Sequence, residues 1–179
     1  MWDLEVKFCQ LDGTLSVQDG TQIEGYASLF GVPDQGGDVV QKGAYAKSLA
    51  SLAKSGRQVK MLWQHDPLTP IGVWDEVYED DRGLYVKGRL LDGVQKAQEA
   101  ATLIEAGALD GLSIGYRTVQ SVAQKSGARG LVELDLWEVS LVTFPMLPTA
   151  RIAAKSQEAH EDISELAALF KSASASVTL

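Results

Sequence analysis

Ser113, which lies between two glycines in the segment 111–116 (Gly-Leu-Ser-Ile-Gly-Tyr), is the strongest candidate for a reactive residue. The segment follows directly after an expected helix and precedes an expected strand. A serine at such a place is either part of a turn or a nucleophile. Because a serine hydroxyl attacks a carbonyl only when a base takes its proton, the second hypothesis requires a histidine within reach.

The chain has two histidines, so the choice of a base is narrow. His65 ends an apolar strand, where strands meet loops and functional sites are built. His160 lies among acidic residues near the C-terminus, which is typical of a solvated position on a helix. Taken alone, His65 would be an ordinary loop residue, and it becomes the expected base only in combination with Ser113.

A catalytic histidine needs a third group that holds its tautomer and orientation. Glu138 alternates with apolar residues on one face of the strand expected over 131–144, which predicts a buried carboxylate. A buried carboxylate needs a partner, and two stay open: an arginine in a structural ion pair, or His65. Asp135 is expected on the opposite, solvated face. Asp66 follows His65 directly, and neighbouring side chains of an extended chain point apart.

The segment 111–115 also matches the Gly-x-Ser-x-Gly motif of the α/β-hydrolase nucleophile elbow. That motif requires a strand before the serine, a helix after it and a histidine downstream. Here the expected helix comes first, the strand follows, and the available order is His65, Ser113 and then an acid. An esterase built on this elbow is therefore disfavoured.

The order of the expected strands and helices predicts an α+β protein. Strands and helices do not alternate as they do in a parallel α/β sheet. We therefore expect a mostly antiparallel β-barrel or sandwich flanked by helices. Strands are expected over 2–11, 14–17, 23–30, 58–64, 71–78, 83–91, 113–122 and 131–144, and helices over 43–54 and 93–106. Pro67 and Pro70 predict a fixed loop after His65. The expected division is a barrel domain over 1–155 and an amphipathic helix with a flexible tail over 156–179.

Composition excludes several classes of function. The net charge of −8 disfavours a nucleic-acid binder, which needs a basic face. No apolar run approaches the ~20 residues that cross a bilayer, and the N-terminus does not read as a signal peptide, so no membrane partner is expected. The single cysteine, Cys9, excludes an internal disulfide and a cysteine-based zinc site, and it fits a reducing compartment. No metal or cofactor is expected.

Five motifs together resemble the prohead (procapsid maturation) protease family of tailed bacteriophages. They lie at 25–30, at 37–40 followed by 43–45, and at 63–66, 111–116 and 138–145. That family is similar to the herpesvirus capsid assemblins, which have a β-barrel ringed by helices and a histidine, a serine and a third residue in this order. The third residue of assemblins is a histidine, and Glu138 stands where it would fall.

The resemblance implies a serine endopeptidase that acts inside the assembling prohead, in the host cytoplasm. It would cleave the scaffolding segment of the major capsid protein, and often itself, through an acyl-enzyme. His65 would take the proton of Ser113, and Glu138 would orient His65. Arg117 and Arg151 would hold the oxyanion or a water, as arginines do in assemblins, although a surface or ion-pair role for both stays open.

Two further expectations depend on the same resemblance. A homodimer, or activation that depends on assembly, follows from the assemblin analogy alone. The rival hypothesis is a non-catalytic assembly factor, in which a protease-like barrel binds scaffold or capsid subunits. The acidic composition and the C-terminal helix would suit that role without any chemistry.

Overall fold

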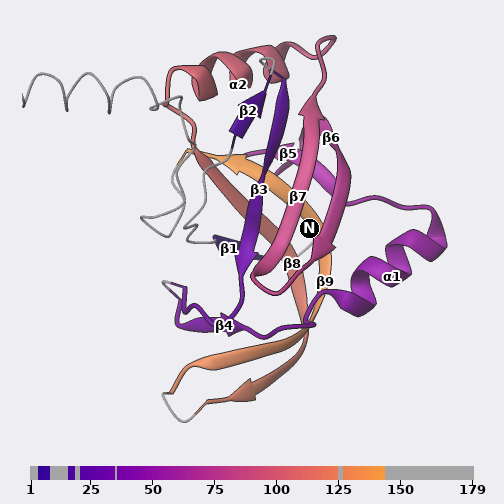
Figure 1. The fold of residues 1–179 in the computed structure, drawn as a ribbon, viewed down its shortest axis with the longest axis vertical. Helices are drawn as coiled ribbons and strands as arrows, with labels where there is room; N and C mark the ends of the chain where they lie inside the picture. The colour runs from indigo at the N-terminus through magenta and orange to yellow at the C-terminus, as the bar shows by residue number, and fades with distance from the viewer. Residues whose placement is uncertain (1–3, 9–15, 19–20, 35, 125–126, 144–179) are drawn as a thin grey trace, which may run out of the picture.

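A computed structural model describes residues 4–8, 16–18, 21–34, 36–124 and 127–143, and within these residues the chain forms one curled sheet with two helices (Figure 1). The strands are β1 (Glu5–Phe8), β2 (Ser16–Gln18), β3 (Gln22–Leu29), β4 (Asp38–Val40), β5 (Lys60–Trp63), β6 (Asp66–Glu79), β7 (Gly83–Leu90), β8 (Gly111–Ala123) and β9 (Arg129–Val142). The helices are α1 (Ala46–Ser55) and α2 (Gln95–Glu105). Neither helix of the described part is long and apolar enough to cross a membrane.

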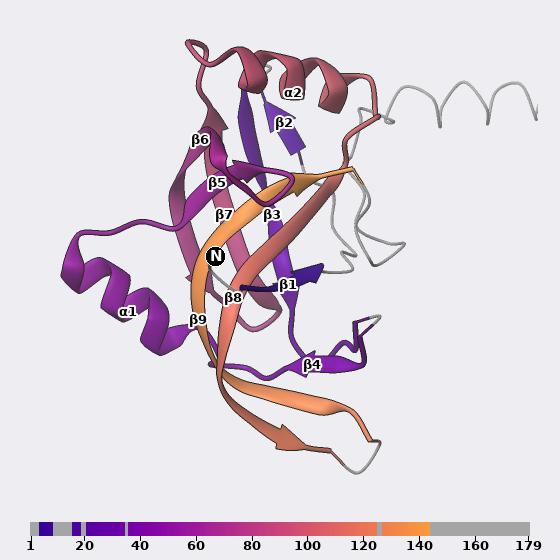
Figure 2. The same cartoon turned by 180° about the vertical axis from the view of Figure 1, so that it is seen from behind.

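The strands follow the order β1-β8-β9-β5-β6-β7-β3-β2, and β4 lies beside β9. The predicted α+β class with a high strand content agrees with this architecture, but the sheet is mixed, because β4 and β5 both run parallel to β9. Parallel pairing joins segments far apart in the sequence, and the hairpin signals that indicate antiparallel neighbours cannot reveal it. Among the described strands no pairing joins β1 to β2, so the sheet is a curled half-barrel (Figure 2).

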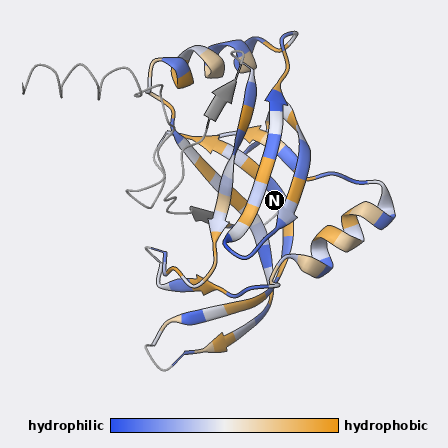
Figure 3. Ribbon diagram, in the orientation of Figure 1, coloured by the Kyte–Doolittle hydropathy of each residue, from blue (hydrophilic) through white to orange (hydrophobic). Residues whose placement is uncertain are grey.

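The core lies against the concave side of this sheet. Figure 3 shows that apolar residues recur along its strands. The largest fully buried side chains come from strands, helices and their connections: Ile23, Tyr45, Met61, Ile71, Leu84, Ile104, Leu109, Leu112, Ile114, Tyr116 and Leu131. Helix α1 ends at Gly56, whose φ of 67° lies in the left-handed region that a helix C-terminus favours. The helices predicted over 43–54 and 93–106 are confirmed as α1 and α2.

The predicted loop after His65 is wrong, because β6 begins at Asp66 and contains both Pro67 and Pro70. This strand pairs with β5 from Asp66 to Val73 through register shifts, whereas its pairing with β7 begins only at Gly72, beyond both prolines. A stretch that pairs on one side does not need every backbone donor, so proline is tolerated there.

Two other segments differ from the expected elements. The segment Asp38–Val40, predicted to close a loop, is the short strand β4. Strand β8 begins at Gly111, so Ser113 lies inside a strand and not at its junction with the helix. The predicted region 156–179 lies outside the described residues, as do Cys9, Arg151 and His160, and the division into two parts stays a prediction.

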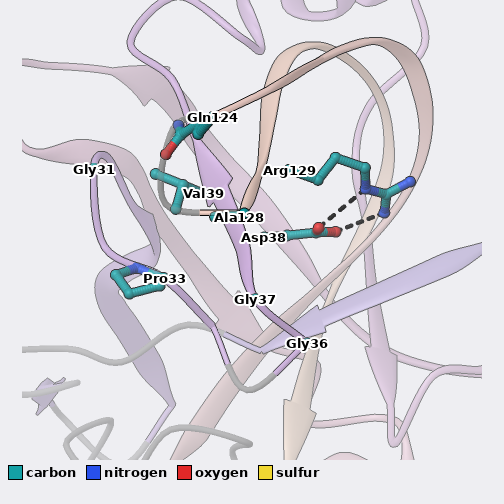
Figure 4. Close-up of a pocket in the computed structure, with 10 residues that line it drawn as sticks. Gly31, Pro33, Gly36, Gly37, Asp38, Val39, Gln124, Ala128 and Arg129 are labelled. Carbon is teal, nitrogen blue, oxygen red and sulfur yellow. Dashed lines mark hydrogen bonds and ion pairs between the residues drawn. The ribbon is translucent and has the colours of Figure 1, made fainter.

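Arg129 joins three strands at the far end of the β8–β9 hairpin. Its Nε and Nη2 donate to the two carboxylate oxygens of Asp38 at 3.0 and 2.6 Å (Figure 4), and Nη2 also donates to Glu5 at 2.7 Å. These hydrogen bonds, to Asp38 first and then to Glu5, raise the pKa of Arg129 above its usual value. The cluster fastens β1 and β4 to β9, beside a groove whose lining includes neither Ser113 nor His65.

Candidate active site

The turn between β5 and β6 holds His65 in a sparsely populated backbone conformation. Trp63 pairs with Asp66, and the two residues between them, Gln64 and His65, have φ values of 51° and 61°. A two-residue hairpin with positive φ at both positions is a type I′ turn, which normally takes Asn-Gly. Strain of this kind persists only where the surroundings enforce it, and it is concentrated at functional sites.

Strand β9 supplies the contacts that enforce the turn. The backbone N–H of Gln64 donates to the carbonyl of Leu141 at 3.0 Å. The side-chain amide of Gln64 donates to Thr143 Oγ1 at 2.5 Å, and the backbone N–H of His65 donates to Ser140 Oγ at 3.1 Å. These hydrogen bonds fix the backbone of the turn on β9, and so they fix the position from which the imidazole of His65 extends.

Register places the other polar residues of the site on one face of the sheet. Ser113 of β8 pairs with Ser140 of β9, and Gly115 pairs with Glu138. Because side chains two residues apart on a strand point the same way, these four positions share a face. Their neighbours Leu112, Ile114, Val139 and Leu141 point the other way, into the core. Glu138 is buried, as predicted, but it does not share a face with the core residues Leu134 and Leu136. A register shift beside Gly115 breaks the alternation there, and Glu138 therefore lies on the same face as Ser113.

Ser113, His65 and Glu138 form a continuous chain of hydrogen bonds. His65 Nε2 lies 2.6 Å from Ser113 Oγ, and His65 Nδ1 lies 2.5 Å from Glu138 Oε1. Ser140 Oγ donates to the other carboxylate oxygen, Oε2, at 2.6 Å. Ser113 and Ser140 are 0 % exposed and Glu138 is 4 % exposed, so the chain is buried.

The partner of the Glu138 carboxylate is therefore the histidine. Among the described residues no arginine forms an ion pair with it, so the structural alternative left open by the sequence has no support. A carboxylate at Nδ1 favours the tautomer that carries its proton there, and Nε2 is then free to accept the proton of the Ser113 hydroxyl. This arrangement can activate a serine for attack on a carbonyl.

Gly115 makes room for the carboxylate. A Cβ built at Gly115 would lie 2.1 Å from Glu138 Oε1 and 2.8 Å from Glu138 Cδ. Real Cβ contacts are never so short, so any side chain at this position displaces the Glu138 carboxylate. The second glycine of the Gly-x-Ser-x-Gly pattern thus has a function unrelated to a nucleophile elbow.

We expect Gly115→Ala to lower peptidase activity by about 100-fold, because a displacement of about 1 Å at a catalytic group has effects of this size. Circular dichroism and thermal unfolding should show a folded protein, since the clash falls on a side chain and not on backbone. Gly93→Ala is the matched control, since a Cβ there meets nothing within 4 Å. Full activity of Gly115→Ala would contradict the assigned role.

Arg117, one of the two arginines predicted to stabilise the oxyanion, contacts an aromatic ring of the neighbouring strand. The guanidinium carbon of Arg117 lies 4.9 Å from the centre of the Trp137 ring. Arg117 follows Ser113 by four positions, or about 13 Å of strand. Arg151 lies outside the described residues. An oxyanion role stays a prediction for both.

The two aspartates weighed against Glu138 have other partners. Asp66 accepts hydrogen bonds from the backbone N–H of Leu68 at 3.0 Å and from the hydroxyl of Thr69, and so fixes the start of β6. Asp135, expected to be solvated, is partly buried and accepts from Trp137 Nε1 at 2.8 Å. Ser140 and Gln64 were not predicted as site residues, although Ser140 could be placed on the same strand face as Glu138 from the alternation alone.

The sequence was compared with those of known protein families. Residues 10–164 match the family described as caudovirus prohead serine protease. The chain belongs to that family. It is 34 % identical over 154 residues to the prohead protease of Enterobacteria phage HK97, a match that covers 83 % of this chain and 67 % of that protein.

A solved structure shares the fold. The structure of the bacteriophage T4 capsid assembly protease superposes with a TM-score of 0.64 and covers 79 % of this chain and 98 % of its own, at 17 % sequence identity. The predicted membership of the prohead proteases is confirmed, and with it the function of a capsid-maturation protease. The further likeness to herpesvirus assemblins stays a prediction.

Proposed function

We propose that this prohead protease is a serine endopeptidase in which Ser113 is the nucleophile, His65 the general base and Glu138 the group that orients His65. Its substrate would be the scaffolding segment of the major capsid protein, and in part its own chain, within the assembling prohead in the host cytoplasm. The continuous, buried hydrogen-bond chain from Ser113 Oγ to Glu138 Oε1 is the observation that supports this proposal most directly.

The proposed reaction begins with proton transfer from Ser113 Oγ to His65 Nε2 as the oxygen attacks the scissile carbonyl. Glu138 then lies next to the imidazolium and stabilises its charge. The same proton passes from His65 to the leaving amine, and the peptide bond breaks to leave an acyl-enzyme on Ser113. A water activated by His65 hydrolyses this ester and restores the free hydroxyl.

Ser140 is a positioning residue in this proposal. Its hydroxyl donates to Glu138 Oε2 at 2.6 Å and accepts from the backbone N–H of His65 at 3.1 Å. One buried hydroxyl therefore restrains both the carboxylate and the strained turn that carries the base. With Oε2 engaged in this way, Oε1 is kept directed at His65 Nδ1.

The proposed nucleophile is less accessible to solvent than the proposed base. Ser113 is 0 % exposed, whereas the side chain of His65 is 18 % exposed. A substrate carbonyl reaches Ser113 only after the groups that cover it move. The activation by assembly or dimerisation that the assemblin analogy implies would supply such a movement, and both remain proposals.

The geometry of the site favours an enzyme over the non-catalytic assembly factor, which the acidic composition alone would also suit. A module that only binds has no need to bury a Ser–His–Glu chain or to hold Gln64 and His65 at positive φ.

A fluorophosphonate probe tests the proposal directly. The Ser113 oxygen should form a bond to phosphorus, fluoride should leave, and the proton should pass to His65. We expect peptide mapping to find the label on Ser113, and labelling to disappear in His65→Ala. Modification of the peptide that contains Ser28, or of no serine at all in proheads that are cleaving their capsid protein, would contradict the assignment.

A further inference from the structure

A cavity of about 500 Å³ adjoins the exposed side of the histidine. Its lining is mostly apolar and comes from four strands: Leu4 and Val6 at β1, Leu62 on β5, Pro67 on β6 and Trp137 on β9. His65 and Glu138 form its wall on the side of the hydrogen-bond chain. Concave apolar sites with a few polar groups are the usual form of a ligand pocket.

Strand register fixes how far this cavity lies from the nucleophile. Val6, Gly115, Glu138 and Lys60 form one row across β1, β8, β9 and β5. Ser113 lies in the next row on the same face, two strand residues or about 7 Å away. An extended peptide has the same spacing between alternate side chains. The cavity can therefore take a side chain within two residues of a carbonyl placed at Ser113.

Lys60 gives the pocket a second property, its charge. The lysine is exposed at the lining, and its side chain has no hydrogen bond or ion pair within the described part of the chain. Lys60 pairs in register with Glu138, whose carboxylate is buried and bound to His65 and Ser140, so the exposed cation lies at the edge of the cavity. It favours an acidic group on whatever occupies the pocket.

We propose that this pocket is a specificity site, which binds a large aliphatic or aromatic side chain of the substrate peptide within two residues of the scissile bond. Lys60 binds an acidic side chain of the same peptide nearby. The inference rests on the proposed function, because it takes the scissile carbonyl to lie at Ser113.

Binding can be measured without turnover in Ser113→Ala protein. A library of blocked octapeptides, randomised at every position, is the probe, and retained peptides are sequenced by mass spectrometry. We expect enrichment of leucine, methionine or phenylalanine with aspartate or glutamate within two residues. Isothermal titration of the best peptide should then show affinity at least about 10-fold weaker when Val6→Trp fills the pocket.

Val122→Trp is the matched control for this substitution. Val122 is 46 % exposed and Val6 is 41 % exposed, both lie on strands, and Val122 does not line the pocket. Equal affinity of the Val6→Trp and Val122→Trp proteins, or a library with no apolar preference, would overturn the proposal.

A charge exchange separates recognition from damage to the fold. Lys60→Glu should lose affinity for the acidic peptide and gain it for the same peptide with lysine in place of the acid, a gain that misfolding cannot produce. Failure to gain would overturn the role of Lys60. Peptide binding that persists while the wild-type protein shows no cleavage and no labelling of Ser113 would instead contradict the proposed function and leave the pocket in place.

Discussion

Ser113→Ala is expected to lower the rate of capsid-protein cleavage by about 10⁴-fold or more, because the variant lacks the hydroxyl of the proposed nucleophile. His65→Ala should have a similar effect, since without the base the hydroxyl is a poor nucleophile. The double variant should be no worse than either single one, because residues that act as a unit are not additive. Cleavage is followed by electrophoresis and mass spectrometry of co-expressed proheads.

A buried serine elsewhere in the sheet provides the control for this experiment. Ser28 is 1 % exposed, and its hydroxyl has no hydrogen-bond partner within the described structure. Ser28→Ala removes an unsatisfied polar atom, so it should keep the protein folded and active. Residual cleavage by Ser113→Ala close to that of Ser28→Ala would exclude Ser113 as the nucleophile.

Glu138→Gln is expected to reduce cleavage by about 10³- to 10⁴-fold with little change in the fold. The glutamine keeps the size of the side chain, but it has no charge to stabilise the imidazolium, and it can present an N–H to Nδ1 and so favour the wrong tautomer. The rate of fluorophosphonate labelling at Ser113 should fall along with cleavage, since both depend on His65 as the base.

Glu133→Gln is the matched control on the same strand. Glu133 lies five positions before Glu138 on β9 and pairs with Lys47 away from the hydrogen-bond chain. We expect it to change cleavage by less than about 2-fold, because a single ion pair of this kind contributes little. If Glu138→Gln cleaves and labels as fast as Glu133→Gln, another group must orient His65.

The parts of the fold that the sequence predicts well are those governed by local patterns. Alternation marks β3 and β7, three- and four-residue spacing marks the two helices, and Gly56 marks the end of α1. The hairpin between β6 and β7 is equally local. Each of these signals lies within a short stretch of chain, so no knowledge of the partner strand is required.

The incorrect predictions concern pairing between distant segments. Pro67 and Pro70 argue against a strand unless the pairing of that stretch with β5 alone is known. Strands β4 and β5 lie parallel to β9 and far from it in the sequence, so no turn motif connects either of them to β9. The type I′ turn at Gln64 and His65 lacks its usual Asn-Gly sequence, since contacts from β9 enforce it.

By itself, the sequence determined which residue types could do chemistry and in what order: the serine between glycines, the histidine at a strand end, and a glutamate whose predicted burial meant that it needed a partner. It could not determine that Glu138 reaches His65, that Ser140 holds both, or that Gly115 must lack a side chain. Those relations depend on the register between β8 and β9 and on a turn strained by its contacts. Both are set by packing over the whole sheet, where a shift of one residue would turn every one of these side chains to the opposite face.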